Sequence, residues 1–285
     1  MKHTVIDKTA LKNKCEELDI PFSNLLAGFV LESFMYLVSD SEFAQCLWLK
    51  NSGIFGVEQY RKKNLLTLEF AYITDERVIR KGTVSPGQKL SLKIAYVMLA
   101  GILKKEKIPE IKWRGRVILK EDVVEFEVAG EFDEMTVPLH VRIREYDGEE
   151  MIPLCRELSP FMGKSKAISY LEYPIENMLA ELLFSIVNHM ELLPEMNCYE
   201  QVYKILDKEA VDGRHIREKL EERCRREQIP LEKERVDTII SYRNYAYMRK
   251  RFEKYLRHRK KKEPDWDTVM EKLSAFLPRV WKSIC

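Results

Sequence analysis

The sequence changes its periodicity once, and this change limits the folds open to the chain. Before Pro174, several stretches alternate apolar and polar residues, most clearly residues 136–144, which is typical of strands with one buried face. After Pro174, apolar residues recur at intervals of three and four, which is typical of amphipathic helices. We therefore expect an α+β chain, with a mixed sheet and flanking helices in residues 1–172 and an all-helical domain in residues 173–285.

The expected elements follow from these periods and from the turn-forming residues between them. Pro174 fits the first turn of a helix, and Ser23 is a candidate cap for an earlier one. Strands are expected at residues 47–49, 65–73, 111–118, 122–129 and 136–144. Helices are expected at residues 8–18, 22–38, 87–103, 174–192, 198–206, 214–227, 232–260 and 265–282.

The composition argues against several classes of protein. No uninterrupted apolar run reaches about 18 residues, so we expect no membrane-spanning helix. The N-terminus lacks the apolar region of a signal peptide, which favours a cytoplasmic protein without membrane contact. The 6 cysteines contain no CxxC pair and the 5 histidines are isolated, so free thiols and no metal site are expected.

The net charge of +2 conceals an uneven distribution along the chain. Residues 214–285 hold 21 Lys/Arg and 12 Asp/Glu, whereas the remainder holds 27 basic and 34 acidic residues. An acidic partner for the C-terminal third is one interpretation of this asymmetry. The other is that the acidic part of the chain packs against the basic part.

The densest basic segment is residues 249–262, where Glu253 is the one acid. Tyr242, Tyr245 and Tyr247 precede it. Because Lys and Arg neutralise phosphates and tyrosine rings stack on unpaired bases, this segment predicts nucleic-acid binding without base specificity. The alternative is a solvated helix whose apolar residues face a core. The side chains assigned to the interface are Arg249, Lys250, Arg251, Lys254, Arg257, Arg259, Lys260, Lys261 and Lys262, with Tyr242 and Tyr245.

Residues 47–73 have the order of elements that a phosphate and metal site requires. An apolar run at residues 47–49 leads into a turn of small residues, and a later strand carries Glu69. The backbone N–H groups of such a turn can approach a triphosphate. Two carboxylates at positions i and i+2 of the strand share one face and can hold Mg²⁺, and a third on a later strand completes a two-metal site. This order is typical of the entry to a nucleotidyltransferase core.

Short segments distributed over nearly the whole chain match one protein family in order and spacing. They begin at Ala10, Val30, Leu47, Tyr173, Leu179, Phe252 and Trp266. Together they resemble the AbiEii/AbiGii-type nucleotidyltransferase toxin family, although no single segment is specific. The resemblance implies a nucleotidyltransferase-like fold, an RNA substrate of the tRNA class and a bacterial or mobile-element defence setting.

The residues that would hold metal in that family are replaced. The family's Asp-x-Asp falls on Thr67-Leu68-Glu69, so only Glu69 keeps a carboxylate. The third acid is expected on residues 136–144, but Arg142 and Arg144 stand there and Glu145 follows, facing the other way. Positive charge at this place opposes Mg²⁺ binding. The vestigial catalytic positions are therefore Thr67, Glu69 and Glu145.

The phosphate-binding positions are also altered. The family's first-strand lysine precedes two glycines, whereas Lys50 precedes Asn51 and Ser52, and Gly53 comes one residue late. Asn tolerates the left-handed conformation, so the turn is expected to survive, but side chains hinder the close approach of a phosphate. The other replaced family positions are Leu182, where a lysine is usual, and Asn197 with Cys198, where an arginine-aspartate pair is usual.

Each of these candidate residues also has a purely structural interpretation. Glu69 suits the exposed face of a strand. Arg142 and Arg144 could bind a phosphate, but they could equally pair with glutamates on a neighbouring strand. The candidate partners are Glu125, Glu127 and Glu131. Likewise, Glu176 and Glu181 are either groups near a site or the exposed face of a helix.

The leading hypothesis is a catalytically degenerate nucleotidyltransferase-fold protein that binds RNA or a protein partner, with no cofactor and no small-molecule substrate. One alternative is an active nucleotidyltransferase that uses Mg²⁺ and NTP to modify RNA or protein, with Glu69 and a displaced acid such as Glu145 or Asp147. Another is a non-catalytic structural or antitoxin-like subunit of a larger complex.

Overall fold

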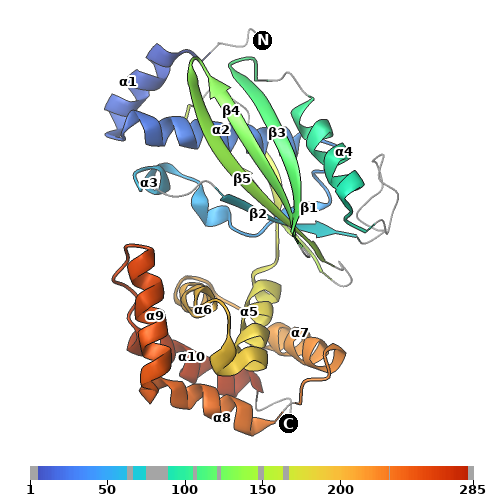
Figure 1. The fold of residues 1–285 in the computed structure, drawn as a ribbon, viewed down its shortest axis with the longest axis vertical. Coiled ribbons are helices and arrows are strands. Elements are labelled where there is room, and N and C mark those ends of the chain that lie inside the picture. Colours follow the sequence, from blue (N-terminus) through green and yellow to red (C-terminus); the bar gives the residue numbers. More distant parts are fainter. Residues whose placement is uncertain are drawn as a thin grey trace. The chain divides into compact units, whose positions relative to one another are not determined.

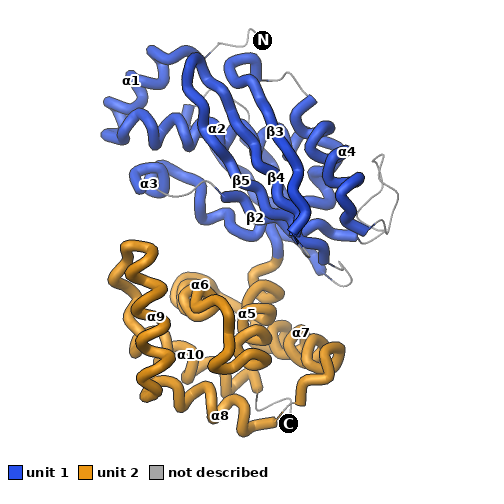
Figure 2. The backbone as a smooth tube through the Cα atoms, in the orientation of Figure 1, with its two compact units in different colours: residues 1–173 blue, residues 174–285 orange. Residues whose placement is uncertain are grey.

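In the computed structural model of the protein, the described residues are 6–62, 67–74, 89–104, 108–120, 123–146, 151–162, 167–230 and 232–281. The chain forms two compact units, residues 1–173 and residues 174–285 (Figure 2). Unit 1 contains a mixed sheet with flanking helices, and the described part of unit 2 is helical. The predicted α+β class is therefore confirmed.

Unit 1 is built on a 7-stranded sheet with the strand order β3-β4-β5-β2-β1-β7-β6. β2 pairs with β5 and β1 pairs with β7 in parallel, while the other neighbours are antiparallel. The strands are β1 (Leu47–Leu49), β2 (Thr67–Ile73), β3 (Ile111–Lys120), β4 (Val123–Phe132), β5 (Met135–Tyr146), β6 (Leu154–Leu158) and β7 (Ile168–Glu172). The helices are α1 (Lys8–Leu18), α2 (Phe22–Ser39), α3 (Val57–Tyr60) and α4 (Leu92–Leu103).

One face of this sheet carries the core of unit 1. Apolar residues at alternate positions of β4 and β5 are buried, as the period of two in their sequences requires. α2 and α4 pack against the strands on this side, and Figure 1 shows α2 crossing behind them. At Gly130 of β4, a Cβ atom would lie 2.8 Å from Val30 of α2, so glycine permits their close approach. The helices therefore cover the apolar face, and the charged side chains of β4 and β5 point to the opposite one.

The apolar helix α2 has a structural explanation. Among the described helices, it alone has the length and apolar character for a membrane span, with a mean hydropathy of 1.4 over 18 residues. However, 67% of this stretch is buried inside the protein, where it packs in the core of unit 1. The search for an uninterrupted apolar run in the sequence did not mark this helix as a candidate membrane span. Its burial in the core accounts for its apolar composition.

Unit 2 buries the apolar stripes of its helices against one another in a second core. Trp266 and Trp281, at the two ends of the last helix, are both almost fully buried in it. The helices are α5 (Ile175–His189), α6 (Asn197–Lys208), α7 (Gly213–Arg226), α8 (Lys233–Ser241), α9 (Ala246–His258) and α10 (Trp266–Trp281).

The prediction of one helix over residues 232–260 is wrong. The structure divides this segment into α8, a short 3-10 helix at Tyr242–Asn244 and α9. Tyr245 is extended, with φ −87° and ψ 105°, and so separates the two α-helices. Residues 242–245 form a corner that no proline or glycine marks in the sequence.

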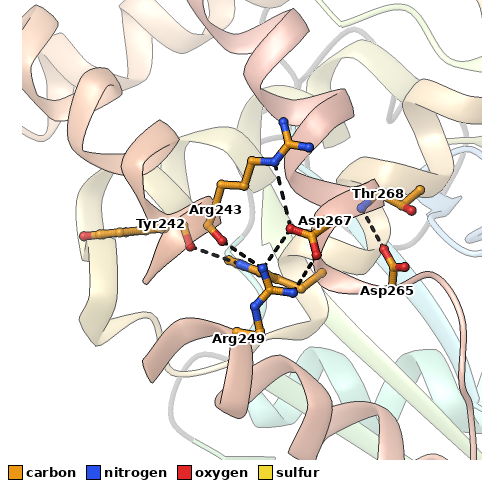
Figure 3. Close-up of polar contacts among 7 residues, drawn as sticks. Tyr242, Arg243, Arg249, Asp265, Asp267 and Thr268 are labelled. Carbon is orange, nitrogen blue, oxygen red and sulfur yellow. Dashed lines mark hydrogen bonds and ion pairs between the residues drawn. The ribbon is translucent and has the colours of Figure 1, made fainter. Parts of the chain in front are cut away.

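Side chains from α9 and α10 hold this corner in place (Figure 3). Trp266 donates its indole N–H to the carbonyl oxygen of Tyr242 at 3.0 Å, and Arg249 donates to that of Arg243 at 3.2 Å. Arg249 also makes two hydrogen bonds to the Asp267 carboxylate, at 2.6 and 2.8 Å. These donors satisfy carbonyl groups that lose their helical partners where α8 ends. The break therefore depends on tertiary contacts.

Other differences from the expected elements are local. α2 begins after Pro21 with no side-chain cap, so Ser23 is not the cap. The described part of the expected helix at residues 87–103 is helical only from Leu92, where Ser91 supplies the cap. α3, β6 and β7 were not predicted. Residues 65–66 of the expected strand at 65–73 and residues 87–88 of the expected helix at 87–103 lie outside the described residues.

A buried carboxyl group fastens α3 to α2. The Glu32 side chain of α2 accepts a hydrogen bond from the Tyr60 hydroxyl at 2.7 Å and one from the Phe161 backbone N–H at 3.1 Å. The Tyr60 ring packs against Gly28, where a Cβ atom would lie 2.9 Å from it. Burial raises the pKa of the Glu32 carboxyl to about 7, and the hydrogen bonds from Tyr60 and Phe161 offset only part of this rise.

This raised pKa predicts a pH-dependent stability of unit 1. A carboxyl whose pKa is higher in the folded state stabilises that state below its usual pKa, and the contribution is lost as the pH rises through about 7. Glu32→Gln mimics the protonated acid, because its amide can donate to the Tyr60 oxygen and its carbonyl can accept from Phe161. Urea unfolding at pH 5.5 and 8 is expected to show that the variant removes a loss of about 2 kcal/mol between these two pH values.

The matched control for this experiment is Glu58→Gln, since Glu58 is exposed on α3 beside the same contact. The control is expected to keep the pH dependence of the parent. The same pH dependence in Glu32→Gln as in the parent protein would contradict the assignment.

Candidate functional site

The charged face of the sheet is centred on the parallel pair β2 and β5. Their register sets Glu69 beside Arg142 and Thr67 beside His140. Because paired residues of neighbouring strands share one face, Glu69 lies on the same face as Arg142. The adjacent pair on this face is Ala71 and Arg144, so no carboxylate stands two residues from Glu69 on β2 in this direction. Glu69 therefore has Arg142 beside it, at a place where metal binding would need a second acid.

Glu145 lies on the other face of the sheet. It pairs with Tyr72, which is fully buried on the core side, and its carboxylate accepts a hydrogen bond from the Leu90 N–H at 2.5 Å. Glu69 and Glu145 therefore cannot bridge one metal ion. Asp147, the other acid considered, lies outside the described residues. Across the described ranges, no group of three His, Cys, Asp or Glu side chains could hold a metal ion.

Arg142 is paired with a neighbouring strand. Its guanidinium lies 3.3 Å from Glu125 of β4, and Lys120 of β3 lies 2.6 Å from the same carboxylate. The hydrogen bond from Lys120, together with the charge of Arg142, holds the pKa of Glu125 below its usual value despite partial burial. Arg144 is exposed and has no ion-pair partner among the described residues. The other predicted glutamates, Glu127 and Glu131, bind arginines of β3, at Arg116 and Arg114.

Lys50 is enclosed by aromatic rings at the end of β1. Its ammonium group donates to the Tyr146 hydroxyl at 2.7 Å and lies 4.3 and 4.4 Å from the ring centroids of Tyr146 and Tyr173. Its backbone N–H bonds to the Glu69 carbonyl oxygen at 2.7 Å. Both cation–π contacts and the hydrogen bond stabilise the ammonium group in this place. Lys50 thus has partners within the sheet.

The turn after Lys50 is closed by its own side chains. The Asn51 amide donates to the Thr67 carbonyl oxygen at 2.8 Å and accepts from the Glu69 N–H at 3.0 Å, so it continues the pairing of β1 with β2. Ser52 donates a short hydrogen bond to Glu172 of β7. Asn51 has φ −130°, so the turn does not use the left-handed conformation that asparagine tolerates. Gly53 also avoids that region, and a Cβ atom there would meet nothing within 4 Å.

Three further replaced positions lie in unit 2, and their side chains have contacts within it. Leu182 of α5 is partly buried against the core of this unit. The Asn197 side chain at the start of α6 lies 2.8 Å from the Tyr255 hydroxyl oxygen, within hydrogen-bond distance. Cys198 is partly buried beside it, and burial raises the pKa of its thiol. These side chains support packing in unit 2, which explains their identities without a ligand.

Part of the predicted nucleic-acid interface is used inside unit 2. Arg249 holds the corner, and Arg251 donates to the backbone carbonyl oxygens of Glu191, at 2.5 Å, and Leu193. Tyr242 is buried, and its hydroxyl donates to the Glu191 carboxylate at 2.6 Å. The polar groups of Tyr242, Arg249 and Arg251 therefore already have partners inside unit 2.

Lys261 belongs to an ion cluster around a buried carboxylate that the sequence did not reveal. Its ammonium group lies 2.7 Å from Glu200 of α6, as does that of Lys204, and the Tyr255 hydroxyl donates to the same carboxylate. Burial alone would raise the pKa of Glu200, but the hydrogen bonds from Lys204, Lys261 and Tyr255 lower it to about 2. Lys261 is thus a structural residue as well.

The remaining basic residues of the segment are exposed. Lys250, Lys254 and Arg257 lie on α9 and form no ion pair within the part of the chain that the structure describes. We call these three residues the α9 stripe. Beyond them, Arg259 lies 5.4 Å from the Tyr255 ring, and the last two exposed cations are Lys260 and Lys262. The predicted interface is therefore reduced to these six side chains and Tyr245, which is 46% exposed.

Comparison with known proteins reveals similarity in structure alone. No protein-family model and no curated protein matches this chain. A candidate nucleotidyltransferase from H. pylori is similar over 91% of this chain and 95% of its own, with 13% identity and a TM-score of 0.45. JHP933 from Helicobacter pylori is similar over 93% and 94%, with 11% identity and a TM-score of 0.44. The roles of individual residues therefore follow from the geometry of this chain.

Two neighbouring cations of α9 are predicted to respond differently to substitution. Arg249→Ala removes the bonds that hold the corner and should lower the thermal midpoint of unit 2 by a few degrees. Lys250→Ala removes an exposed charge with no partner among the described residues and should leave the midpoint nearly unchanged. Thermal unfolding followed by circular dichroism distinguishes the two. Equal midpoints in both variants would show that Arg249 has no structural role.

Proposed function

We propose that this chain has a nucleotidyltransferase-like unit 1 that no longer transfers nucleotides, and that it acts by binding RNA through the exposed cations of α9. The observation that carries the proposal is the division of the basic segment into cations paired within unit 2 and an exposed α9 stripe of Lys250, Lys254 and Arg257. Three cations on one helical face suit a polyphosphate backbone.

The sheet face supports the non-catalytic half of the proposal. The Mg²⁺ that an active member of the resembled family would use requires carboxylates on one face, and the described residues do not fit it. Glu69 has Arg142 as its neighbour, and Glu145 is on the opposite face. At the turn, the side chains of Asn51 and Ser52 hydrogen-bond to Thr67 and Glu172. Two glycines at these positions would have no side chains and would leave the backbone open to a phosphate.

The biological setting is proposed from the sequence resemblance alone. Its resemblance to the AbiEii/AbiGii-type family would place the chain in a bacterial or mobile-element defence system and in the cytoplasm. A protein partner and a role as an antitoxin-like subunit are the competing proposals, and no contact within the described residues favours either of them.

The loss of transfer activity predicts a negative labelling result with a positive control. The full chain, incubated with Mg²⁺ and each labelled NTP, should add no nucleotide to total RNA or to protein, whereas a known RNA nucleotidyltransferase labels the same RNA. Mg²⁺-dependent labelling that disappears in Glu69→Ala would instead establish the active alternative.

RNA binding through α9 predicts a charge-dependent affinity. Replacing Lys250, Lys254 and Arg257 with Glu should weaken binding of an unstructured oligoribonucleotide at least about tenfold, and should reduce the salt slope by about 2, since each phosphate contact on a single strand contributes about 0.7. Fluorescence anisotropy over a series of salt concentrations measures both quantities.

A control with the same change in charge separates this site from general electrostatics. Arg214, Arg225 and Lys233 are exposed elsewhere in unit 2, and their replacement with Glu changes the net charge equally. The control should lose much less affinity than the α9 variant. Equal losses would show that net charge, and not the α9 stripe, determines binding.

A further inference from the structure

Two exposed tyrosines stand at the start of α9. Tyr245 is 46% exposed and Tyr247 is 50% exposed, and their ring centroids are 5.8 Å apart. Tyr245 also lies 5.8 Å from the ring of Tyr242, which is buried and bound to Glu191. The exposed rings therefore continue a row of aromatic side chains that is anchored inside unit 2.

The neighbours of these rings hold them in position. The guanidinium of Arg251 lies 5.6 Å from the Tyr247 ring, and it is itself bound to the backbone carbonyl oxygens of Glu191 and Leu193. The Tyr245 ring is near the rings of both Tyr242 and Tyr247. Because a tyrosine has few rotatable bonds and these contacts restrict them further, binding a ligand here would cost little side-chain entropy.

The α9 stripe extends from the same point. Lys250 and Lys254 follow Tyr247 by three and seven residues, which places all three on one face of the helix. From Tyr247 to Arg257 this face is about 15 Å long, at 1.5 Å per residue. One end of the face therefore offers aromatic rings and the rest offers cations with no ion-pair partner among the described residues.

We propose that Tyr245 and Tyr247 form a stacking platform for an unpaired base, so that the α9 face binds single-stranded RNA in preference to duplex RNA. This inference rests on the proposed RNA binding and names the form of RNA. A single strand presents phosphates and accessible base faces together, whereas a duplex covers its base faces. An acidic peptide would use the cations but would gain less from the rings.

The experiment compares three polyanions on the full chain. A short unstructured oligoribonucleotide, an RNA duplex of the same length and poly-glutamate are titrated under the same salt conditions, with anisotropy as the readout. The parent protein should bind the single strand most tightly. Replacing both Tyr245 and Tyr247 with Ala should weaken single-strand binding by about tenfold or more, since stacking contributes about 1–3 kcal/mol per base, and should leave the other two affinities nearly unchanged.

Two controls keep the result specific. Replacing both tyrosines with Phe retains the rings and should retain the preference for the single strand, which assigns the preference to the rings and not to the hydroxyl groups. Tyr96→Ala removes a tyrosine of unit 1 that is 53% exposed and should change none of the affinities.

The outcomes separate this inference from the proposal on which it rests. If the α9 charge variant loses affinity but the tyrosine variant does not, the stacking platform is disproved and RNA binding stands. If poly-glutamate binds as tightly as the single strand, the platform is also disproved and a protein partner is favoured. If neither variant changes RNA affinity, both proposals fail.

Discussion

The parallel pairing of β2 with β5 determines which charged side chains share a face of the sheet. Leu68 and Phe70 are buried in the core of unit 1, so β2 cannot slip by one residue without exposing them. This register sets Glu69 beside Arg142 and directs Glu145 to the opposite face. The packing of the core therefore decides the chemistry of the exposed face, and it separates the two acids that a metal site would have to bring together.

In unit 2, the cations of the basic segment divide into those that have polar partners within the unit and those that are exposed. Arg249 and Arg251 bind carbonyl and carboxylate oxygens around the corner, and Lys261 binds the buried Glu200. Removing one partner of such a group leaves a charge or a polar atom without compensation, so these cations are tied to folding. Exposed cations such as Lys254 have no ion-pair partner among the described residues, so they are available to a ligand. The candidate binding surface in this unit thus consists of the cations that are not needed for folding.

The sequence was sufficient where a long, regular pattern faces one core. β4, β5 and α2 were predicted near their observed bounds because their apolar positions follow a single period. β6 is an exposed edge strand of five residues without alternation, and α3 has four residues, so neither carries a readable period. The corner at residues 242–245 was missed because Trp266 and Arg249 create it from a distance. For the site, charge counts located the basic segment, but only the fold shows which cations are paired.

Direct measurement of divalent-metal binding tests the central claim about the sheet face. Titration of the full chain with Mn²⁺, with and without ATP, can be followed by the electron paramagnetic resonance signal of the unbound ion. With Arg142 beside Glu69 and Glu145 on the other face, we predict that the protein leaves the Mn²⁺ signal unchanged and does not alter the signal of Mn²⁺ with ATP. Stoichiometric loss of that signal in the parent protein, abolished by Glu69→Ala, would contradict this account.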